Sequence, residues 1–254
     1  MQELEGRVAI VTGASRGIGA ATAHELAGHG VAVLLAARGL GEIEAMAEAI
    51  RNAGGRAEAM ACDVSRYADV AAMVDRCRTE FGRLDILVNN AGVIEPIARL
   101  ADSNPDHWDQ VVDINLKGVY HGLRATIPVM LKQGSGTVVN ISSGAATGAM
   151  EGWSHYCSTK AAVLSLTRCA HKEYGDKGVR VVGLSPGTVA TGMQVAIKAS
   201  GINPVSKLDP SVHIPPAWAA RAVAWLCTED AAEFAGTDFA LKSDEGRQRV
   251  GLPD

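Results

Sequence analysis

Short apolar runs alternate with longer alanine-rich stretches along almost the whole chain. The runs lie at 7–11, 31–36, 56–61, 84–88, 137–141, 179–184 and 238–241, and most contain few polar residues. Runs that are apolar on both faces are typical of strands buried inside a parallel sheet. The stretches at 17–29, 40–53, 66–81, 106–132, 156–174 and 216–228 predict helices between them. This alternation predicts an α/β fold with a doubly wound parallel sheet and helices on both faces.

The composition excludes several classes of protein. No Pro/Gly/Ser-rich linker divides the chain, so we interpret 1–254 as a single domain. The net charge is −4 and basic residues form no stripe, which argues against a nucleic-acid partner. No run approaches 18 apolar residues, so we expect no membrane span. The five cysteines form no C-x-x-C pair, the start resembles no signal peptide, and the histidines form no H-x-x-x-H pattern. We therefore expect a cytoplasmic protein with reduced thiols and no metal.

A glycine-rich loop follows the first predicted strand and precedes a helix. It reads Thr12-Gly13-Ala14-Ser15-Arg16-Gly17-Ile18-Gly19. Glycines allow a tight turn and bring backbone N–H groups close to a pyrophosphate, and the helix N-terminus adds partial positive charge. We interpret the loop as the phosphate site of a dinucleotide, with Gly13, Ser15, Arg16, Gly17, Ile18 and Gly19 contacting the cofactor. The alternative is a structural turn.

The end of the second strand bears on which dinucleotide binds. A site selective for NAD usually places an acidic residue there for the ribose 2′-hydroxyl. This chain reads Leu35-Ala36-Ala37-Arg38, without an acid. Arg38 could meet a 2′-phosphate, and Arg16 could hold its other side, because guanidinium groups suit phosphate. The pattern favours NADP(H); the alternative is that Arg38 is a solvated loop residue.

Two further segments follow strands in the order that a dinucleotide site requires. Asp63 and Val64 follow the third strand, and the carboxylate of Asp63 could accept from the adenine amino group or cap the next helix. Asn89-Asn90-Ala91-Gly92 follows the fourth strand, and we expect Asn90, Ala91 and Gly92 to pass close to the adenosine ribose. As an isolated tetrapeptide this segment could also be a turn.

Tyr156 and Lys160 are four residues apart on a predicted helix and therefore share a face. A free tyrosine has a pKa of about 10, and a nearby ammonium stabilises its phenolate. The pair could serve as a proton donor and the cation that tunes it, or it could be an exposed surface pair. Ser142 and Ser143 end the fifth strand, where a hydroxyl could bond a substrate oxygen, or where they could form only a turn.

Together these motifs resemble the short-chain dehydrogenase/reductase family in its short single-domain form, including members similar to 3-oxoacyl-[acyl-carrier-protein] reductases. The matching motifs are T-G-x-x-x-G-I-G from Thr12, Asn89-Asn90-Ala91-Gly92, Asn115 in "DINLKGVYHG", "NISS", Y-x-x-x-K at Tyr156 and Lys160, and "SPGTVAT". They occur in the family's order between residue 6 and about 192. The resemblance implies a Rossmann fold with a seven-stranded parallel sheet. It also implies a homo-oligomer, a dimer or tetramer, with helices 106–132 and 156–174 at the main contact.

The resemblance also implies roles for individual residues. Tyr156 would be the catalytic acid/base, and Lys160 would lower its pKa and bond the nicotinamide ribose. Ser143, thirteen residues before the tyrosine, would orient the substrate oxygen, and Asn115 would hold a water that links Lys160 to solvent. Four residues would flank the nicotinamide: Pro186, Gly187, Val189 and Thr191.

We therefore expect an NADP(H)-dependent oxidoreductase that interconverts a small-molecule ketone and a secondary alcohol. The alternatives are a 3-oxoacyl-thioester reductase, or an NAD-dependent alcohol, steroid or sugar dehydrogenase. More distant alternatives are a nucleotide-sugar epimerase or dehydratase, which usually needs a larger C-terminal domain, and an NADP(H) sensor, which typically loses the tyrosine or the lysine.

The pocket is expected to be mostly apolar, with walls at 94–99, 144–154 and a lid at 187–216. His155 is expected to pack or to lie at the pocket rim, because adjacent helical residues point about 100° apart. The last strand departs from the family pattern, since Lys242-Ser243 replaces an Asp-Gly pair and the tail is charged. This departure puts the second tetramer interface in doubt.

Overall fold

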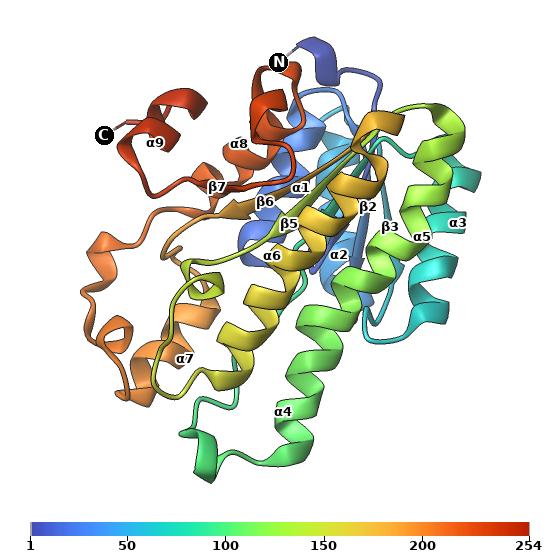
Figure 1. The fold of residues 1–254 in the computed structure, drawn as a ribbon. Coiled ribbons are helices and arrows are strands. Elements are labelled where there is room, and N and C mark those ends of the chain that lie inside the picture. Colours follow the sequence, from blue (N-terminus) through green and yellow to red (C-terminus); the bar gives the residue numbers. More distant parts are fainter. Residues whose placement is uncertain (1, 254) are drawn as a thin grey trace.

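The seven apolar runs form one parallel sheet in the computed structural model, which describes residues 2–253 (Figure 1). The strands are β1 Val8–Thr12, β2 Ala32–Ala37, β3 Ala57–Ala61, β4 Ile86–Asn89, β5 Gly136–Ile141, β6 Val179–Ser185 and β7 Asp238–Ala240. Their order is β3-β2-β1-β4-β5-β6-β7, and all neighbours are parallel. The predicted Rossmann fold with a seven-stranded parallel sheet is confirmed.

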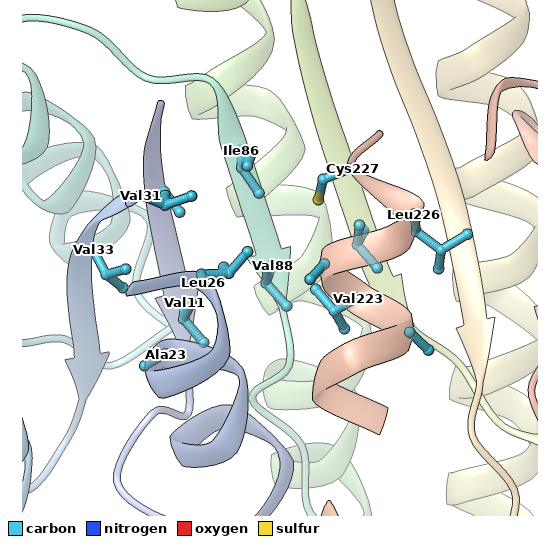
Figure 2. Close-up of a cluster of buried hydrophobic side chains, with 14 of the residues drawn as sticks. Val11, Ala23, Leu26, Val31, Val33, Ile86, Val88, Val223, Leu226 and Cys227 are labelled. Carbon is cyan, nitrogen blue, oxygen red and sulfur yellow. The ribbon is translucent and has the colours of Figure 1, made fainter. Parts of the chain in front are cut away.

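Helices cover both faces of this sheet. One layer consists of α1 Gly17–Gly28, α2 Leu40–Asn52 and α8 Pro216–Leu226, and the other of α3 Tyr67–Phe81, α5 Gly118–Gln133 and α6 Ser154–Tyr174. Alternate strand residues face the two layers: Val11 packs with the first and Ile10 with the second. Figure 2 shows Leu26 of α1 and Val223 of α8 lying beside Val88 in the first layer. Within the described residues, no helix has the length and apolar character needed to cross a membrane.

The predicted helix at 106–132 is interrupted. It consists of α4 Pro105–Val112, a π-helical turn over Asp113–Lys117, and α5. In that turn the N–H of Gly118 donates to the carbonyl of Asp113, five residues earlier. A π-turn holds an extra residue and is frequent at functional sites. Asn115, one of the predicted site residues, lies at its centre.

Two further helices lie in segments for which the sequence predicted no separate helix. The first is α7 Gly192–Ser200, inside the predicted lid, and the second is α9 Asp244–Val250, in the charged tail. The tail carries helix-end signals: the Ser243 hydroxyl accepts from the Gly246 N–H at 3.0 Å, and Gly251 closes the helix with φ +69°. Val250 is buried against the first core layer, so the tail packs onto the domain.

The strand order reverses between β1 and β4, because β2 and β3 extend the sheet in one direction and β4 to β7 in the other. In open α/β sheets, ligands bind outside the carboxyl ends of the strands at such a reversal. Figure 1 shows α4 and α7 extending beyond the sheet near the segments that follow β4 and β6. The site predicted from sequence therefore lies at this carboxyl edge.

Candidate active site

The glycine loop between β1 and α1 needs its glycines for close packing. Gly13 and Gly17 have φ values of +62° and +58°, a region that side chains disfavour. A Cβ at Gly13 would lie 2.8 Å from the Cα of Ala91, and one at Gly19 would collide with the carbonyl oxygen of Gly13. Arg16, at the N-cap of α1, makes no side-chain capping bond. The start of α1 is thus left open to an anion, as a pyrophosphate site requires.

Other residues of the predicted loop have separate positions. Ser15 is half-buried, Arg16 is exposed, and Ile18 packs against the first core layer. Arg16 therefore extends from the loop, while Ile18 anchors α1 to the sheet.

Asn90 holds the glycine loop in place. Its Nδ2 donates to the carbonyls of Thr12 at 2.8 Å and of Gly13 at 3.1 Å. The Thr12 hydroxyl accepts from the N–H groups of Asn90 and Ala91. The Asn90 amide thus braces the loop, a role that the sequence analysis did not assign to it. Gly92 lies against the side chain of Asn115, where an added Cβ would be 3.4 Å from Oδ1.

An open cavity of about 220 Å³ lies at the predicted adenosine end. We call it the acidic cavity; it is lined by Arg38, Asp63, Ser65, Asp106, Asp109, Gln110, Asp113 and Ile114. Arg38 is exposed and has no ion-pair or hydrogen-bond partner within residues 2–253. Asp113 pairs with Lys117 at 2.6 Å. The cavity therefore combines the cation predicted for a 2′-phosphate with carboxylates that the sequence analysis did not place there.

Asp63 stabilises the turn after β3. Its Oδ1 accepts from the N–H of Ser65 at 3.0 Å and from the Ser65 hydroxyl at 2.7 Å. The helix α3 begins only at Tyr67, with Arg66 at its N-cap, so Asp63 does not cap the helix itself. The neighbouring Val64 is 9% exposed and packs in the second core layer.

Tyr156 and Lys160 both lie in a buried cluster near the N-terminus of α6. They are 7% and 5% exposed, and the Lys160 Nζ lies 5.6 Å from the centroid of the Tyr156 ring. The Lys160 ammonium donates to the Ile141 carbonyl at 2.6 Å. The Ser143 hydroxyl accepts from the Ala145 N–H at 3.2 Å and lies close enough to the Tyr156 phenol to lower its pKa, whereas the Ser142 hydroxyl donates to Asp238. The structure thus groups Ser143, Tyr156 and Lys160, and the pair is not an exposed surface pair.

Burial controls the ionisation of this cluster. It raises the pKa of Tyr156 to about 12, and the nearby Ser143 hydroxyl opposes this rise. It also lowers the pKa of Lys160 to about 8, which the charge of Asp238 opposes. Desolvation outweighs the opposing effect of Ser143, so the pKa of Tyr156 lies above its ordinary value. That Lys160 lowers this pKa stays a prediction.

Asn115 is 1% exposed and its side chain is fully used by protein contacts. Its Oδ1 accepts from the Val93 N–H, and its Nδ2 donates to the Val93 carbonyl, both at 2.8 Å. Nδ2 also reaches the Thr159 hydroxyl at 3.4 Å. The side chain therefore ties the segment after β4 to α6, and the predicted water held by Asn115 stays a prediction.

The segment after β6 lies against the glycine loop. A Cβ at Gly17 would lie 3.1 Å from Cγ2 of Thr191. Gly187, directly after Pro186, has φ +82°. Val189 forms a parallel bridge with Ile214 that uses the flanking peptide groups, so its own N–H and C=O face away from that bridge. This orientation leaves Val189 able to bind a carboxamide.

The three predicted pocket walls meet at Tyr156. An apolar cluster joins Ile94, Ala145, Trp153, Tyr156 and Ile197, with Ile97, Cys157, Met193 and Val205 packed against it.

Polar contacts also connect the segments that form the three predicted pocket walls. Arg99 pairs with Glu151 at 2.7 Å, and the Asn203 amide donates to the Glu151 carbonyl at 3.0 Å. His155 is buried and donates to the Ile94 carbonyl, so it packs as the sequence predicted.

One acidic group near this cluster, Asp238, was not predicted from the sequence. Its Oδ2 accepts from the Ser142 hydroxyl at 2.9 Å, across the end of the sheet. An acidic residue inside an otherwise apolar final strand was the available signal.

Comparison with known proteins places this arrangement in a family. A family model described as short chain dehydrogenase matches residues 7–200. The cis-4-hydroxycyclohexanecarboxylate dehydrogenase of Sinomonas cyclohexanicum is 37% identical over 238 residues, 92% of this chain and 94% of the relative. The crystal structure of levodione reductase has a TM-score of 0.87 at 30% identity, covering 98% of this chain and 99% of that chain. NAD+-bound xylitol dehydrogenase has a TM-score of 0.87 at 28% identity, covering 94% and 98%. The chain belongs to the short-chain dehydrogenase/reductase family and is an oxidoreductase that acts on alcohols or ketones.

Proposed function

We propose that the protein is an NADP(H)-dependent oxidoreductase that interconverts a ketone and a secondary alcohol, with Tyr156 as the acid/base. The observation that carries this proposal is the buried cluster of Ser143, Tyr156 and Lys160 at the carboxyl edge of the sheet. It adjoins an apolar cluster on one side, and the segment after β6 connects it to the glycine loop on the other.

The side chains have separate tasks in this chemistry. A bound nicotinamide supplies or accepts the hydride. The Ser143 hydroxyl orients the substrate oxygen and stabilises the Tyr156 phenolate. In ketone reduction Tyr156 donates its proton to that oxygen, and in alcohol oxidation its phenolate removes the proton. Lys160 holds a cation beside the ring at 5.6 Å, which favours the phenolate.

The position of Tyr156 on α6 assists the same ionisation. Tyr156 is the third residue of α6, and the N-terminus of a helix stabilises nearby negative charge. Because burial raises the pKa of Tyr156 to about 12, the protein needs further positive charge to use it as a base near neutral pH. An oxidised nicotinamide would contribute such a charge.

Arg38 and Arg16 support the choice of NADP(H). Arg38 directly follows β2, where an NAD-selective site usually has an acid, and both guanidinium groups are exposed. Neither is engaged by an acidic side chain in the described part of the chain. Both therefore remain available to a 2′-phosphate.

NAD(H) is the second candidate, and the acidic cavity favours it. Asp63, Asp106 and Asp109 line the same space as Arg38 and would repel a 2′-phosphate. The similar xylitol dehydrogenase is bound to NAD+. Ratios of kcat/KM for NADPH and NADH decide between the two cofactors.

An apolar substrate of modest size is the class we propose. The cluster around Tyr156 is aliphatic and aromatic, and the Trp153 ring packs edge-on against Tyr156 at 5.7 Å. The indole N–H of Trp153 is buried and lacks an acceptor among residues 2–253. A cyclic ketone or alcohol with a second oxygen would suit this environment, which agrees with the named activities of levodione reductase and of the hydroxycyclohexanecarboxylate dehydrogenase.

The experiment that tests this function measures oxidation of NADPH and NADH over a panel of carbonyl compounds. The panel holds cyclic ketones, open-chain sugar ketones, steroids and 3-oxoacyl thioesters. We expect the highest kcat/KM for a cyclic ketone with NADPH. A preference for thioesters would replace the substrate proposal, and turnover of no carbonyl with either cofactor would contradict the function.

We also propose that the protein works as a homo-oligomer through α5 and α6. Tyr120 on α5 is 49% exposed and would be covered in such an interface. Light scattering of the purified protein should give a mass of at least twice 26.4 kDa.

A further inference from the structure

Asp238 is a half-buried acid to which the proposed chemistry assigns no role. It is the first residue of β7, and its Oδ2 accepts from the Ser142 hydroxyl at 2.9 Å. Its Oδ1 is buried and has no hydrogen-bond partner within residues 2–253. Leaving a carboxylate oxygen in this state costs free energy, so its charge needs another source of stabilisation.

The sheet has a gap that accommodates this carboxylate. Asp238 pairs in register with Gly183 of β6, and Gly183 in turn pairs with Asn140 of β5. A Cβ at Gly183 would collide with Oδ1 of Asp238. The missing side chain at Gly183 therefore lets the carboxylate lie over β6 and reach Ser142.

The end of β5 links Asp238 to the catalytic lysine. Ile141 accepts a hydrogen bond from Lys160 at 2.6 Å, and the next residue, Ser142, donates to Asp238. No ion pair within 4 Å joins Lys160 to Asp238 in the described chain, so their charges interact at a longer distance than a salt bridge. Because Lys160 is 5% exposed and the Oδ1 atom of Asp238 is buried, solvent screens this interaction less than it would at the surface.

The ionisable groups around Asp238 come from one helix. Lys160 and Arg168, both on α6, lower the pKa of Asp238, whereas burial raises it. In return, Asp238 raises the pKa of Lys160 against the effect of burial. From β5 and β6 the neighbours are the neutral Ser142 and Gly183. Tyr156, whose pKa burial raises, faces Lys160.

We propose that Asp238 is a positioning residue for the oxidoreductase reaction: its carboxylate keeps Lys160 in the ammonium form, and its bond to Ser142 fixes the strand end that carries Ile141 and Ser143. This inference rests on the proposed function of Lys160. A bound oxidised nicotinamide would add a positive charge near Lys160, and the carboxylate would offset it.

The direct test follows Lys160 itself by NMR. Lysine labelled with ¹³C at Cε is titrated in the wild type, in Asp238→Asn and in Ser142→Ala, and the Lys160 signal is identified by its loss in Lys160→Met. Asp238→Asn should lower the pKa of Lys160 by about one unit, the usual effect of removing one nearby opposite charge. Ser142→Ala keeps the charge and should shift it less. An unchanged Lys160 titration in Asp238→Asn would overturn the proposal.

A reciprocal measurement covers the case in which Asp238→Asn does not fold. The Cγ signal of Asp238 is titrated in the wild type and in Lys160→Met. Coupled charges act on each other equally, so the pKa of Asp238 should rise when Lys160 is removed. A pKa of Asp238 that does not move would also overturn the proposal.

The pH dependence of kcat/KM distinguishes an effect of the Asp238 charge on Lys160 from a structural effect of the substitution. In Asp238→Asn the alkaline limb of kcat/KM for ketone reduction should move to lower pH by about the same one unit. A loss of activity that is equal at every pH would mean that Asp238 acts only on structure, against the proposal. The NMR titrations do not require turnover. If the wild type reduced no ketone, that result would count against the proposed function, but the coupling between Asp238 and Lys160 could still be measured.

Discussion

The two ends of the predicted cofactor site differ in how far their ionisable groups are exposed to solvent. At the catalytic end, Tyr156 and Lys160 are almost fully buried and sit against an apolar cluster. At the adenosine end, Arg38 is exposed and shares an open cavity with carboxylates such as Asp106 and Asp109. Desolvation has the largest effect on pKa values at the catalytic end, whereas solvent and salt screen the charges at the adenosine end.

This difference shows where a substitution will act. A buried charge has few partners and large effects on protonation, so changes at the catalytic end should alter chemical steps. An exposed charge acts by attraction in high dielectric, where each pair contributes about 1 kcal/mol or less. Changes at the adenosine end should therefore alter selectivity between cofactors by modest factors.

The largest effect is expected from Tyr156→Phe. Removing the hydroxyl removes the proton donor, so kcat should fall by about three orders of magnitude, within the range of general acid–base catalysis. Cofactor affinity, measured by nicotinamide fluorescence, should be nearly unchanged. Tyr67→Phe, at the exposed start of α3, is the matched control and should keep full activity. Normal turnover in Tyr156→Phe would remove Tyr156 from the mechanism.

Lys160→Met should reduce kcat by about two orders of magnitude. The same variant should also reveal how much unfolding free energy the buried ammonium costs the folded protein. Burial lowers the pKa of Lys160 from 10.5 to about 8. The folded state therefore binds fewer protons than the unfolded state between these values, so wild-type stability rises with pH across this window. Relative to the variant, the wild type should gain about 3 kcal/mol of unfolding free energy between pH 8 and 10.5.

Urea unfolding of both proteins at pH 7, 8, 9 and 10.5 measures this change. A constant difference between variant and wild type across the series would mean that Lys160 is not desolvated in the folded chain.

Arg38→Asp tests the exposed end. An acid after β2 would repel a 2′-phosphate and could accept from a ribose 2′-hydroxyl, so the kcat/KM ratio of NADPH to NADH should fall by about 10- to 100-fold. Arg66→Asp is the control, because Arg66 is exposed nearby but does not line the acidic cavity. If both variants behave alike, Arg38 has no specific part in cofactor choice.

The smallest effect is expected from a chelator. Although carboxylates gather in the acidic cavity, no group of three or more metal-binding side chains has suitable geometry within residues 2–253. Incubation with EDTA followed by desalting should leave kcat within experimental error. A clear loss of activity, restored by a divalent ion, would show that the adenosine end also binds a metal that no sequence motif predicts.

The sequence was sufficient for the sheet because its strands are apolar on both faces. Residues such as Ile10 and Val11 face opposite layers yet are both fully buried, and few other structures need that pattern. The i,i+4 spacing of Tyr156 and Lys160 was likewise readable, because it depends on one helix.

Tertiary contacts decided the rest. The π-turn around Asn115 depends on its bonds to Val93, which lies twenty-two residues earlier. The link from Ser142 to Asp238 spans ninety-six residues. The rise that burial causes in the pKa of Tyr156 could not be predicted, because helix spacing shows that a cation is near but not how much water both groups lose.

Because Gly183 has no side chain, the residues tolerated at positions 183 and 238 depend on each other, although the two positions are far apart in the sequence. Any side chain at residue 183 takes the space of the Asp238 carboxylate. In a library randomised at both positions, we expect active clones with Asp238 to keep glycine at 183. Clones with a larger residue at 183 should survive only with a small residue at 238. The residue at position 183 of β6 thus determines whether β7 can carry a carboxylate at position 238.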